Sequence, residues 1–388
     1  MIFAVRTRTR YAVVAGASFL LLRMASVDRA TAQESTTVGG YGELHYNQPD
    51  GNKDNSPVGA SRGTLDFHRF VLYLAHAFRE DLSFKSEVEI EHTKIEGGEG
   101  GEVAVEQAFL DWHLSSLLGL RAGILLPPVG IINQTHEPPT FNGVERPNVD
   151  HFIIPTTWRE SGAGFYGTIA EGFSYQAYLV AGMLGKNFSG EEGIYEGKQE
   201  ALESTPVNPS LTGRLEAVPD PGIRLGGSFF AGNTNGGDAA LGSATLKLFA
   251  ADLRYSVENL SIRAEAAIDM VSDADRINNA SRDSSGEMTR FAADQSYGWY
   301  AEGAYNIMPW ICDRSDAQLS PFIRYERYNT QSEVTGFAAN PLYDRKEITL
   351  GATFKPTFDT AFKIDYQFLD NAAGQNSRQL NLGIGYSF

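Results

Sequence analysis

The last eleven residues, 378–388, alternate strictly between two kinds of side chain. Every even position from Leu380 to Phe388 is apolar or aromatic, and every odd position is small or polar. A period of two predicts a β-strand with a different environment on each face. Eleven residues at ~3.3 Å each and a ~40° tilt cover roughly 28 Å, enough for the ~25 Å apolar band of a transmembrane barrel. The aromatic residue Phe388 suits the interfacial rim of such a barrel.

Similar strand-like segments recur along the whole chain, and sixteen of them can be counted. They cover residues 38–46, 64–78, 82–95, 103–114, 118–126, 160–170, 173–184, 210–217, 222–232, 244–256, 260–271, 294–306, 318–329, 345–355, 360–369 and 378–388. An even number is typical of single-chain bacterial barrels. We therefore predict an all-β fold, a transmembrane antiparallel up-and-down β-barrel of about 16 strands.

The connections between these segments alternate between short and long along the chain. Those after even segments are mostly short, as at 79–81 and 171–172, whereas those after odd segments are mostly long, as at 127–159 and 185–209. Outer-membrane barrels have short periplasmic turns and long extracellular loops. No linker divides the chain, so residues 33–388 are expected to form one barrel domain.

The first 32 residues have the features of a cleaved secretory signal peptide. Arg6, Arg8 and Arg10 precede the apolar segment 11–22, and residues 30–32 form an A-x-A cleavage site. An organellar presequence would share the arginines and is the alternative. No later apolar run is long enough for a membrane helix, which leaves a barrel as the way to span a bilayer.

The composition argues against several classes of protein. The formal net charge of −16 excludes general nucleic-acid binding, which needs a basic surface. Cys312 is the single cysteine, so no intramolecular disulfide can form. The sequence contains no G-x-S-x-G or H-E-x-x-H motif, and the seven histidines lack ligand-like spacing. We expect no enzyme activity, no cofactor and no metal site.

The connection 127–159 is the longest and contains six of the 16 prolines. Proline lowers the entropy lost when a loop is ordered, so this third extracellular loop is expected to be fixed. We predict that it folds into the lumen as a pore constriction; the alternative is a rim loop or a contact with a neighbouring subunit. The candidate constriction residues are His136, Glu137, Glu145, Arg146, Asp150, Arg159 and, at the end of the preceding strand, Arg121.

Several short motifs in residues 64–170 resemble the phosphate-selective porin O and P family. They are Arg69-Phe70-Val71, residues 81–85 with Glu89, Ala108–Trp112, Leu120–Gly123, Pro127–Gly130 and Glu145-Arg146-Pro147. The resemblance implies a sixteen-stranded porin of the bacterial outer membrane, often a homotrimer. It also implies passive diffusion of ions and small hydrophilic solutes, with anions such as phosphate as possible substrates.

The predicted registers place charges of both signs on the inner wall. The basic residues are Lys85, Arg121, Arg214, Arg224, Arg254, Arg263, Arg324 and Lys363. The acidic residues are Glu87, Glu89, Glu91, Asp111, Glu216, Asp252, Glu265, Asp269, Glu302, Glu326 and Asp365. Such a mixed wall does not predict phosphate selectivity. Because a dry, unpaired carboxylate costs several kcal/mol, Glu87, Glu89 and Glu91 are expected to contact lumen water.

We predict a water-filled porin as the function. The expected partners are outer-membrane lipid, lipopolysaccharide, two further copies of the chain and, through the C-terminal strand, the barrel-assembly machinery. Two alternatives remain: a barrel with an occluded lumen that acts as an adhesin or receptor, and an outer-membrane hydrolase.

Overall fold

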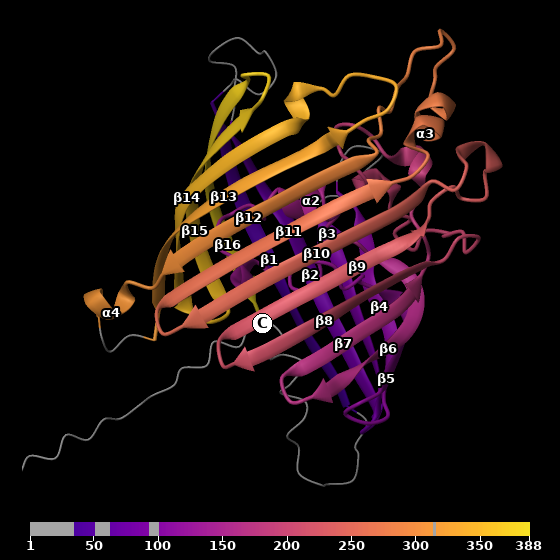
Figure 1. The fold of residues 1–388 in the computed structure, drawn as a ribbon. Helices are drawn as coiled ribbons and strands as arrows, with labels where there is room; N and C mark the ends of the chain where they lie inside the picture. Colours follow the sequence, from indigo (N-terminus) through magenta and orange to yellow (C-terminus); the bar gives the residue numbers. More distant parts are fainter. Residues whose placement is uncertain (1–34, 51–62, 93–100, 313–315) are drawn as a thin grey trace, which may run out of the picture.

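The computed structural model describes residues 35–50, 63–92, 101–312 and 316–388. The predicted signal peptide 1–32 lies outside these residues. Sixteen strands form a closed barrel in which each strand pairs with its neighbours in the chain and β1 pairs with β16 (Figure 1). All of these pairs are antiparallel, which confirms the predicted up-and-down barrel.

The strands are β1 (Ser35–Pro49), β2 (Thr64–Arg79), β3 (Leu82–Glu91), β4 (Val103–His113), β5 (Gly119–Leu125), β6 (Glu160–Ala170), β7 (Phe173–Val180), β8 (Ser210–Asp220), β9 (Ile223–Asn233), β10 (Thr245–Val257), β11 (Leu260–Val271), β12 (Gln295–Tyr305), β13 (Gln318–Glu333), β14 (Asp344–Thr357), β15 (Thr360–Asn371) and β16 (Asn376–Ser387). The helical elements are η2 (Pro138–Thr140), α2 (Val149–Phe152), η3 (Gly185–Asn187), η4 (Tyr195–Gly197), η5 (Ala239–Leu241), α3 (Ala274–Ala280), α4 (Met308–Ile311) and η6 (Pro341–Tyr343). Helix α4 lies at the end with the short turns and α3 at the end with the long loops (Figure 1). None of the helices in the described part of the chain could span a membrane.

Each predicted segment corresponds to one strand, and 160–170 and 260–271 have the predicted bounds. Strand β13 is longer than predicted, because its ladder with β12 continues past the apolar stretch to Glu333. Strand β3 is shorter, since it ends at Glu91 and the next residue, His92, has a φ of 51°. A left-handed backbone conformation interrupts the ladder there.

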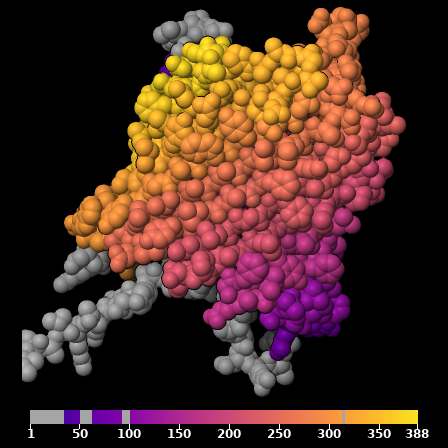
Figure 2. Space-filling view, in the orientation of Figure 1, coloured from indigo at the N-terminus to yellow at the C-terminus, as the bar shows by residue number. Residues whose placement is uncertain are grey.

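The outer wall of the barrel is apolar around its middle. Figure 2 shows this wall as a continuous surface over the visible strands. Large apolar side chains point outward from the inner part of many strands, among them Leu72, Leu110, Ile323, Leu350, Ile364 and Leu382. Exposed aromatic residues follow the rim with the short turns: Phe78, Trp112, Trp310, Phe358 and Phe388. An apolar band with an aromatic girdle is the surface that a bilayer covers.

The seam between the first and last strands depends on a close approach of backbones. Gly40 and Phe388 exchange two backbone hydrogen bonds of 3.0 and 2.9 Å. A Cβ atom on Gly40 would lie 2.2 Å from the carbonyl oxygen of Val71, so only glycine fits between β2 and the terminal residue. Because the seam is closed, none of the described strands has an unpaired edge in the membrane.

This two-faced wall generates a stability prediction. Leu382 is 41% exposed in the middle of β16, so Leu382→Arg places a charge toward lipid and should lower the free energy of unfolding by about 2–4 kcal/mol. Val257 lies at the turn end of β10, and Val257→Arg should cost only about 0–1 kcal/mol because its charge reaches the interface. Denaturant unfolding from lipid vesicles measures both, and equal losses would contradict the assigned membrane position.

Candidate functional site

The loop 127–159 connects β5 to β6 and lies inside the barrel. Its apolar side chains are buried among inward-facing residues of the wall, and the largest of them, Trp158, is fully buried with its ring 4.5 Å from the ring of Phe230 on β9. The other buried apolar residues of the loop are Val129, Ile131, Ile132, Phe141, Val144, Val149, Ile153 and Ile154. Removing this surface from water favours the inward position by roughly 25 cal/mol per Å².

The wall itself contributes apolar side chains to this internal core. Leu246, Leu248 and Ala250 alternate along β10 and all point inward, where they belong to the same buried cluster as Trp158. The periodicity of the sequence did not predict this core, because the outward residues of β10 include Phe249 and both faces of the strand carry apolar side chains. The lumen is therefore packed with apolar side chains beside the extracellular halves of β9 and β10 rather than filled with water.

Inward carboxylates of the wall accept hydrogen bonds from the backbone of the loop. The amide of Val144 donates to Asp365 on β15 at 2.6 Å. The amide of Ile131 donates to Glu265 on β11 at 3.0 Å, and that of Val149 to Glu326 on β13 at 3.2 Å. These contacts attach the loop to three strands. They also give buried carboxylates and loop amides the partners that both need.

A histidine of the loop meets two further carboxylates at β3 and β4. The Nε2 atom of His136 lies 3.4 Å from Glu87 Oε1 and 3.3 Å from Glu106 Oε2. Burial lowers the pKa of His136, but the Glu106 and Glu87 carboxylates outweigh it and raise this pKa well above the usual 6.5. The imidazolium is therefore the form that these carboxylates stabilise.

This geometry corrects the expectation that the acids of β3 contact open water. Glu87 and Glu89 do point into the lumen, but each is only 1% exposed. His136 replaces water at Glu87, and the Arg69 guanidinium lies 3.4 Å from Glu89. The third of these acids, Glu91, lies at the end of β3 and lines a cavity.

The structure brings some of the predicted constriction residues together. Glu145, Arg146 and Asp150 line one cavity, and Glu145 accepts a 2.8 Å hydrogen bond from Asn47 of β1. Glu137 lies apart from them and accepts a 3.2 Å hydrogen bond from the Tyr73 hydroxyl.

Two predicted constriction residues lie against other elements. Arg159 pairs with Glu102 at 3.5 Å and Glu200 at 3.3 Å, which joins the loop to two neighbouring connections. Arg121 lies 3.3 Å from Asp111 on β4, and its guanidinium stacks 4.2 Å from the Tyr166 ring. Neither arginine lines the cavity that contains Glu145.

Most of the predicted lumen-lining bases pair with an acid of the wall. The pairs are Lys85–Asp111 at 3.0 Å, Arg214–Asp252 at 2.7 Å, Arg224–Glu216 at 3.2 Å and Arg324–Glu326 at 2.7 Å. Such pairing neutralises charge that a free solute would otherwise meet.

Three inward basic residues contact the loop instead of a wall carboxylate, and all three lie at the turn formed by residues 139–141. Arg263 donates to the Thr140 carbonyl at 2.8 Å, and Lys355 donates to the Pro139 carbonyl. The Lys363 ammonium lies 3.7 Å from the centre of the Phe141 ring. Within the described residues, none of the three forms an ion pair with a carboxylate. Arg263 and Lys363 were predicted to line the lumen, whereas Lys355, two residues after inward-facing Thr353, was missed.

Cavities lie on both sides of the loop. One of about 400 Å³ faces the extracellular end, and one of about 220 Å³ faces the periplasmic end. The first is lined by loop residues 145–148 and by wall residues that include His45, His68, Glu91 and Gln379. The second is lined by Gly130, Ile131, Gln134 and Thr135 and by Tyr175, Arg214, Glu216 and Arg254. Both are predominantly lined by polar and charged groups, as aqueous vestibules are.

A closed sixteen-stranded barrel with a lipid-facing outer band defines an integral outer-membrane β-barrel. Solved porins share the fold. The anion-selective porin from Comamonas acidovorans matches with a TM-score of 0.58 and 12% identity over 92% of this chain and 100% of its own. Salmonella typhi OmpF matches with a TM-score of 0.60 and 15% identity, over 91% and 97%. The channel DcaP of Acinetobacter baumannii matches with a TM-score of 0.58 and 12% identity, over 92% and 97%.

At the level of sequence, no family model matches this chain. A protein of Aquifex aeolicus (strain VF5), described as an uncharacterized protein, is 36% identical over 348 residues. The match covers 86% of this chain and 76% of the relative, so the chain belongs to the same family as the Aquifex protein.

The His136 contacts generate a second prediction. His136→Ala removes the cation between Glu87 and Glu106 and leaves two buried carboxylates without compensation, which should lower the free energy of unfolding by about 3–5 kcal/mol. The control is His113→Ala, because His113 is exposed at the turn end of β4 and should cost far less. Denaturant unfolding in detergent compares the two. A loss no larger than that of the control would mean that His136 does not hold the loop.

Proposed function

We propose that this protein is an outer-membrane porin through which ions and small hydrophilic solutes diffuse passively. The observation that carries the proposal is the position of loop 127–159, which lies inside a closed barrel with polar cavities on both of its sides. A loop attached to three strands narrows the lumen without depending on a neighbouring subunit. A solute would pass from the extracellular cavity, along the loop, to the periplasmic cavity.

We further propose that small anions, with phosphate among them, are favoured at the turn 139–141. Arg263, Lys355 and Lys363 surround this turn, and the described residues give none of them a carboxylate partner within ion-pair distance. In a narrow, partly dehydrated passage, unpaired cations attract anions through a lower dielectric than bulk water. The preference should be weak, because the other inward arginines that the structure pairs with acids, such as Arg214 and Arg324, offer little net charge.

The adhesin or receptor alternative is favoured by one observation, the apolar core beside β9 and β10 that occupies part of the lumen. A barrel with a fully occluded lumen would fold normally but would conduct no ions. We also propose that the protein is not an enzyme, since the inward charges of the described residues mostly pair with one another or contact the loop. Assembly as a homotrimer, contact with lipopolysaccharide and recognition by the barrel-assembly machinery stay predictions.

The proposed anion preference can be measured as a reversal potential in planar bilayers under a salt gradient. The double variant Arg263→Gln with Lys355→Gln removes two cations beside the turn and should shift the reversal potential toward cation selectivity. The matched control is Arg276→Gln on the external helix α3, whose side chain is 53% exposed. Its effect should be small, because salt screens exposed charges beyond ~8–10 Å.

Three outcomes are distinguishable in that experiment. A shift confined to the double variant supports anion passage at the turn 139–141. Equal reversal potentials in all three proteins would overturn the anion preference but not the porin. A folded wild-type barrel without conductance would overturn the porin and favour the receptor.

A further inference from the structure

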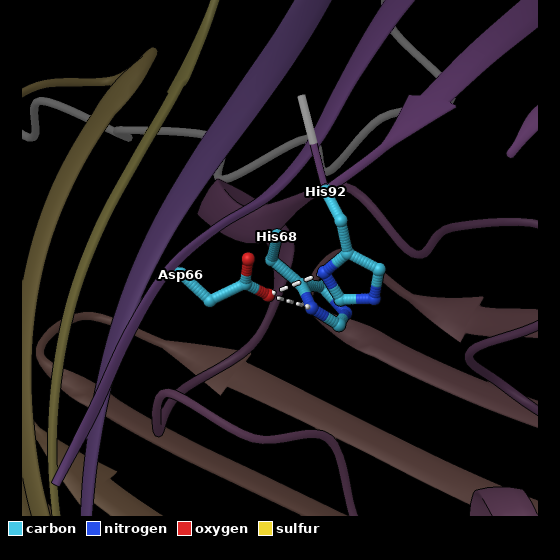
Figure 3. Close-up of side chains that lie close together, drawn as sticks. All are labelled: Asp66, His68 and His92. Carbon is cyan, nitrogen blue, oxygen red and sulfur yellow. Dashed lines mark hydrogen bonds and ion pairs between the residues drawn. The ribbon is translucent and has the colours of Figure 1, made fainter. Parts of the chain in front are cut away.

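Three potential metal ligands converge at the extracellular mouth of the barrel. Asp66 and His68 are two residues apart on β2, so both side chains lie on the same face of the strand, and His92 directly follows β3. Asp66 Oδ2 lies 2.8 Å from His92 Nδ1 and 3.4 Å from His68 Nδ1 (Figure 3). One carboxylate oxygen therefore faces two imidazoles that come from different strand ends.

The local backbone explains how the three residues meet. The register between β1 and β2 shifts between Glu43 and His45. Glu43 pairs with Arg69, whereas His45 pairs with Asp66. This shift lets the consecutive residues His68 and Arg69 both line the extracellular cavity. His92 turns toward β2 in a left-handed conformation, and its amide donates to the His68 carbonyl at 3.2 Å.

The imidazole of His68 is also held from its other side. The His45 ring stacks on it with 4.8 Å between ring centres and 9° between planes. Stacking and the Asp66 contact fix the orientation of His68 before any ligand binds. Preorganised ligands lose less conformational entropy when they bind an ion.

The spacing of the three donor atoms suits one small cation. All three lie within 4.8 Å of one another. Two ligands of a tetrahedral site at 2.0–2.2 Å from zinc are ~3.3 Å apart, so side-chain rotations alone could close the triad around an ion. The side chains of Asp66, His68 and His92 are 25%, 38% and 46% exposed, so water can occupy the remaining coordination positions.

We propose that Asp66, His68 and His92 form a reversible binding site for a divalent transition-metal ion of the zinc type. Two imidazoles and one carboxylate favour zinc, cobalt or nickel over calcium or magnesium, which prefer oxygen ligands. The acids that line the cavity, Glu43, Glu91, Glu145 and Asp150, outnumber the arginines that line it, Arg69 and Arg146, and this excess of negative charge favours cations. Sequence spacing did not reveal this site, because the triad forms only when β2 and β3 pair.

A second cluster of suitable residues serves as an internal comparison. Glu87, Glu106 and His136 also have converging donor atoms, but all three are at most 3% exposed, and there the imidazole already compensates the carboxylates. An ion at that cluster would need to displace the contact that holds the loop. The open triad at the mouth is therefore the better candidate.

Cobalt absorption spectroscopy tests the proposal directly. The full chain, purified without a polyhistidine tag and treated with chelator, is titrated with Co²⁺, whose visible bands report nitrogen and oxygen ligation. We expect about one ion per chain, displaced by Zn²⁺. Asp66→Asn and His92→Ala should each weaken binding about tenfold or more.

Two control variants make the result specific. His76→Ala should bind Co²⁺ as the wild type does, since His76 belongs to the same strand but contacts Thr36 near the opposite end. Heat-modifiable gel migration verifies that each variant is folded. The assignment would be overturned if folded Asp66→Asn and His92→Ala bound Co²⁺ as tightly as the wild type. Loss of binding in His136→Gln alone would also overturn it. The same holds if the wild type ligates no Co²⁺.

Discussion

The hydrogen bonds between wall carboxylates and the backbone of loop 127–159 determine the interior of this barrel. A closed barrel of sixteen strands encloses more space than its own side chains fill, and a dry inward acid without a partner costs several kcal/mol. Asp365, Glu265 and Glu326 obtain those partners from loop amides, and the loop amides obtain acceptors from the same contacts. The position of the loop and the charge of the lumen are thus consequences of one requirement, that buried polar groups be paired.

This requirement divides the lumen into regions of different character. Beside the extracellular halves of β9 and β10, apolar loop residues pack on Leu246 and Leu248. Beside β1, β2 and β16, the loop leaves a cavity lined by His45, Arg69 and Glu145. If the protein is the porin proposed above, its passage for solutes runs off-centre through this cavity, past charged side chains such as Arg69 and Glu145. The selectivity of such a passage depends on which of these groups lacks a partner in the wall.

The sequence predicted the barrel well and the site only in outline. Alternation along segments such as 260–271 is a local property, and it identified the strands and the inward faces of Arg263 and Glu265 correctly. The contact of Val144 with Asp365 joins residues 221 positions apart, and no local pattern encodes it. For the same reason Glu87 and Glu89 were expected to meet water, whereas His136 and Arg69 occupy those positions. The His68–His92 contact likewise depends on strand pairing and a register shift.

Single-channel conductance with and without the centre of the loop tests this account most directly. Deletion of residues 133–150 removes Val144, Val149 and the His136 contacts but leaves the strands that form the barrel wall. If the loop narrows the lumen, a folded deletion variant should conduct several times more current per channel than the wild type, because current rises with the cross-section of the passage. An unchanged conductance in a folded, heat-modifiable variant would contradict the account, since the loop would then lie outside the path of the ions.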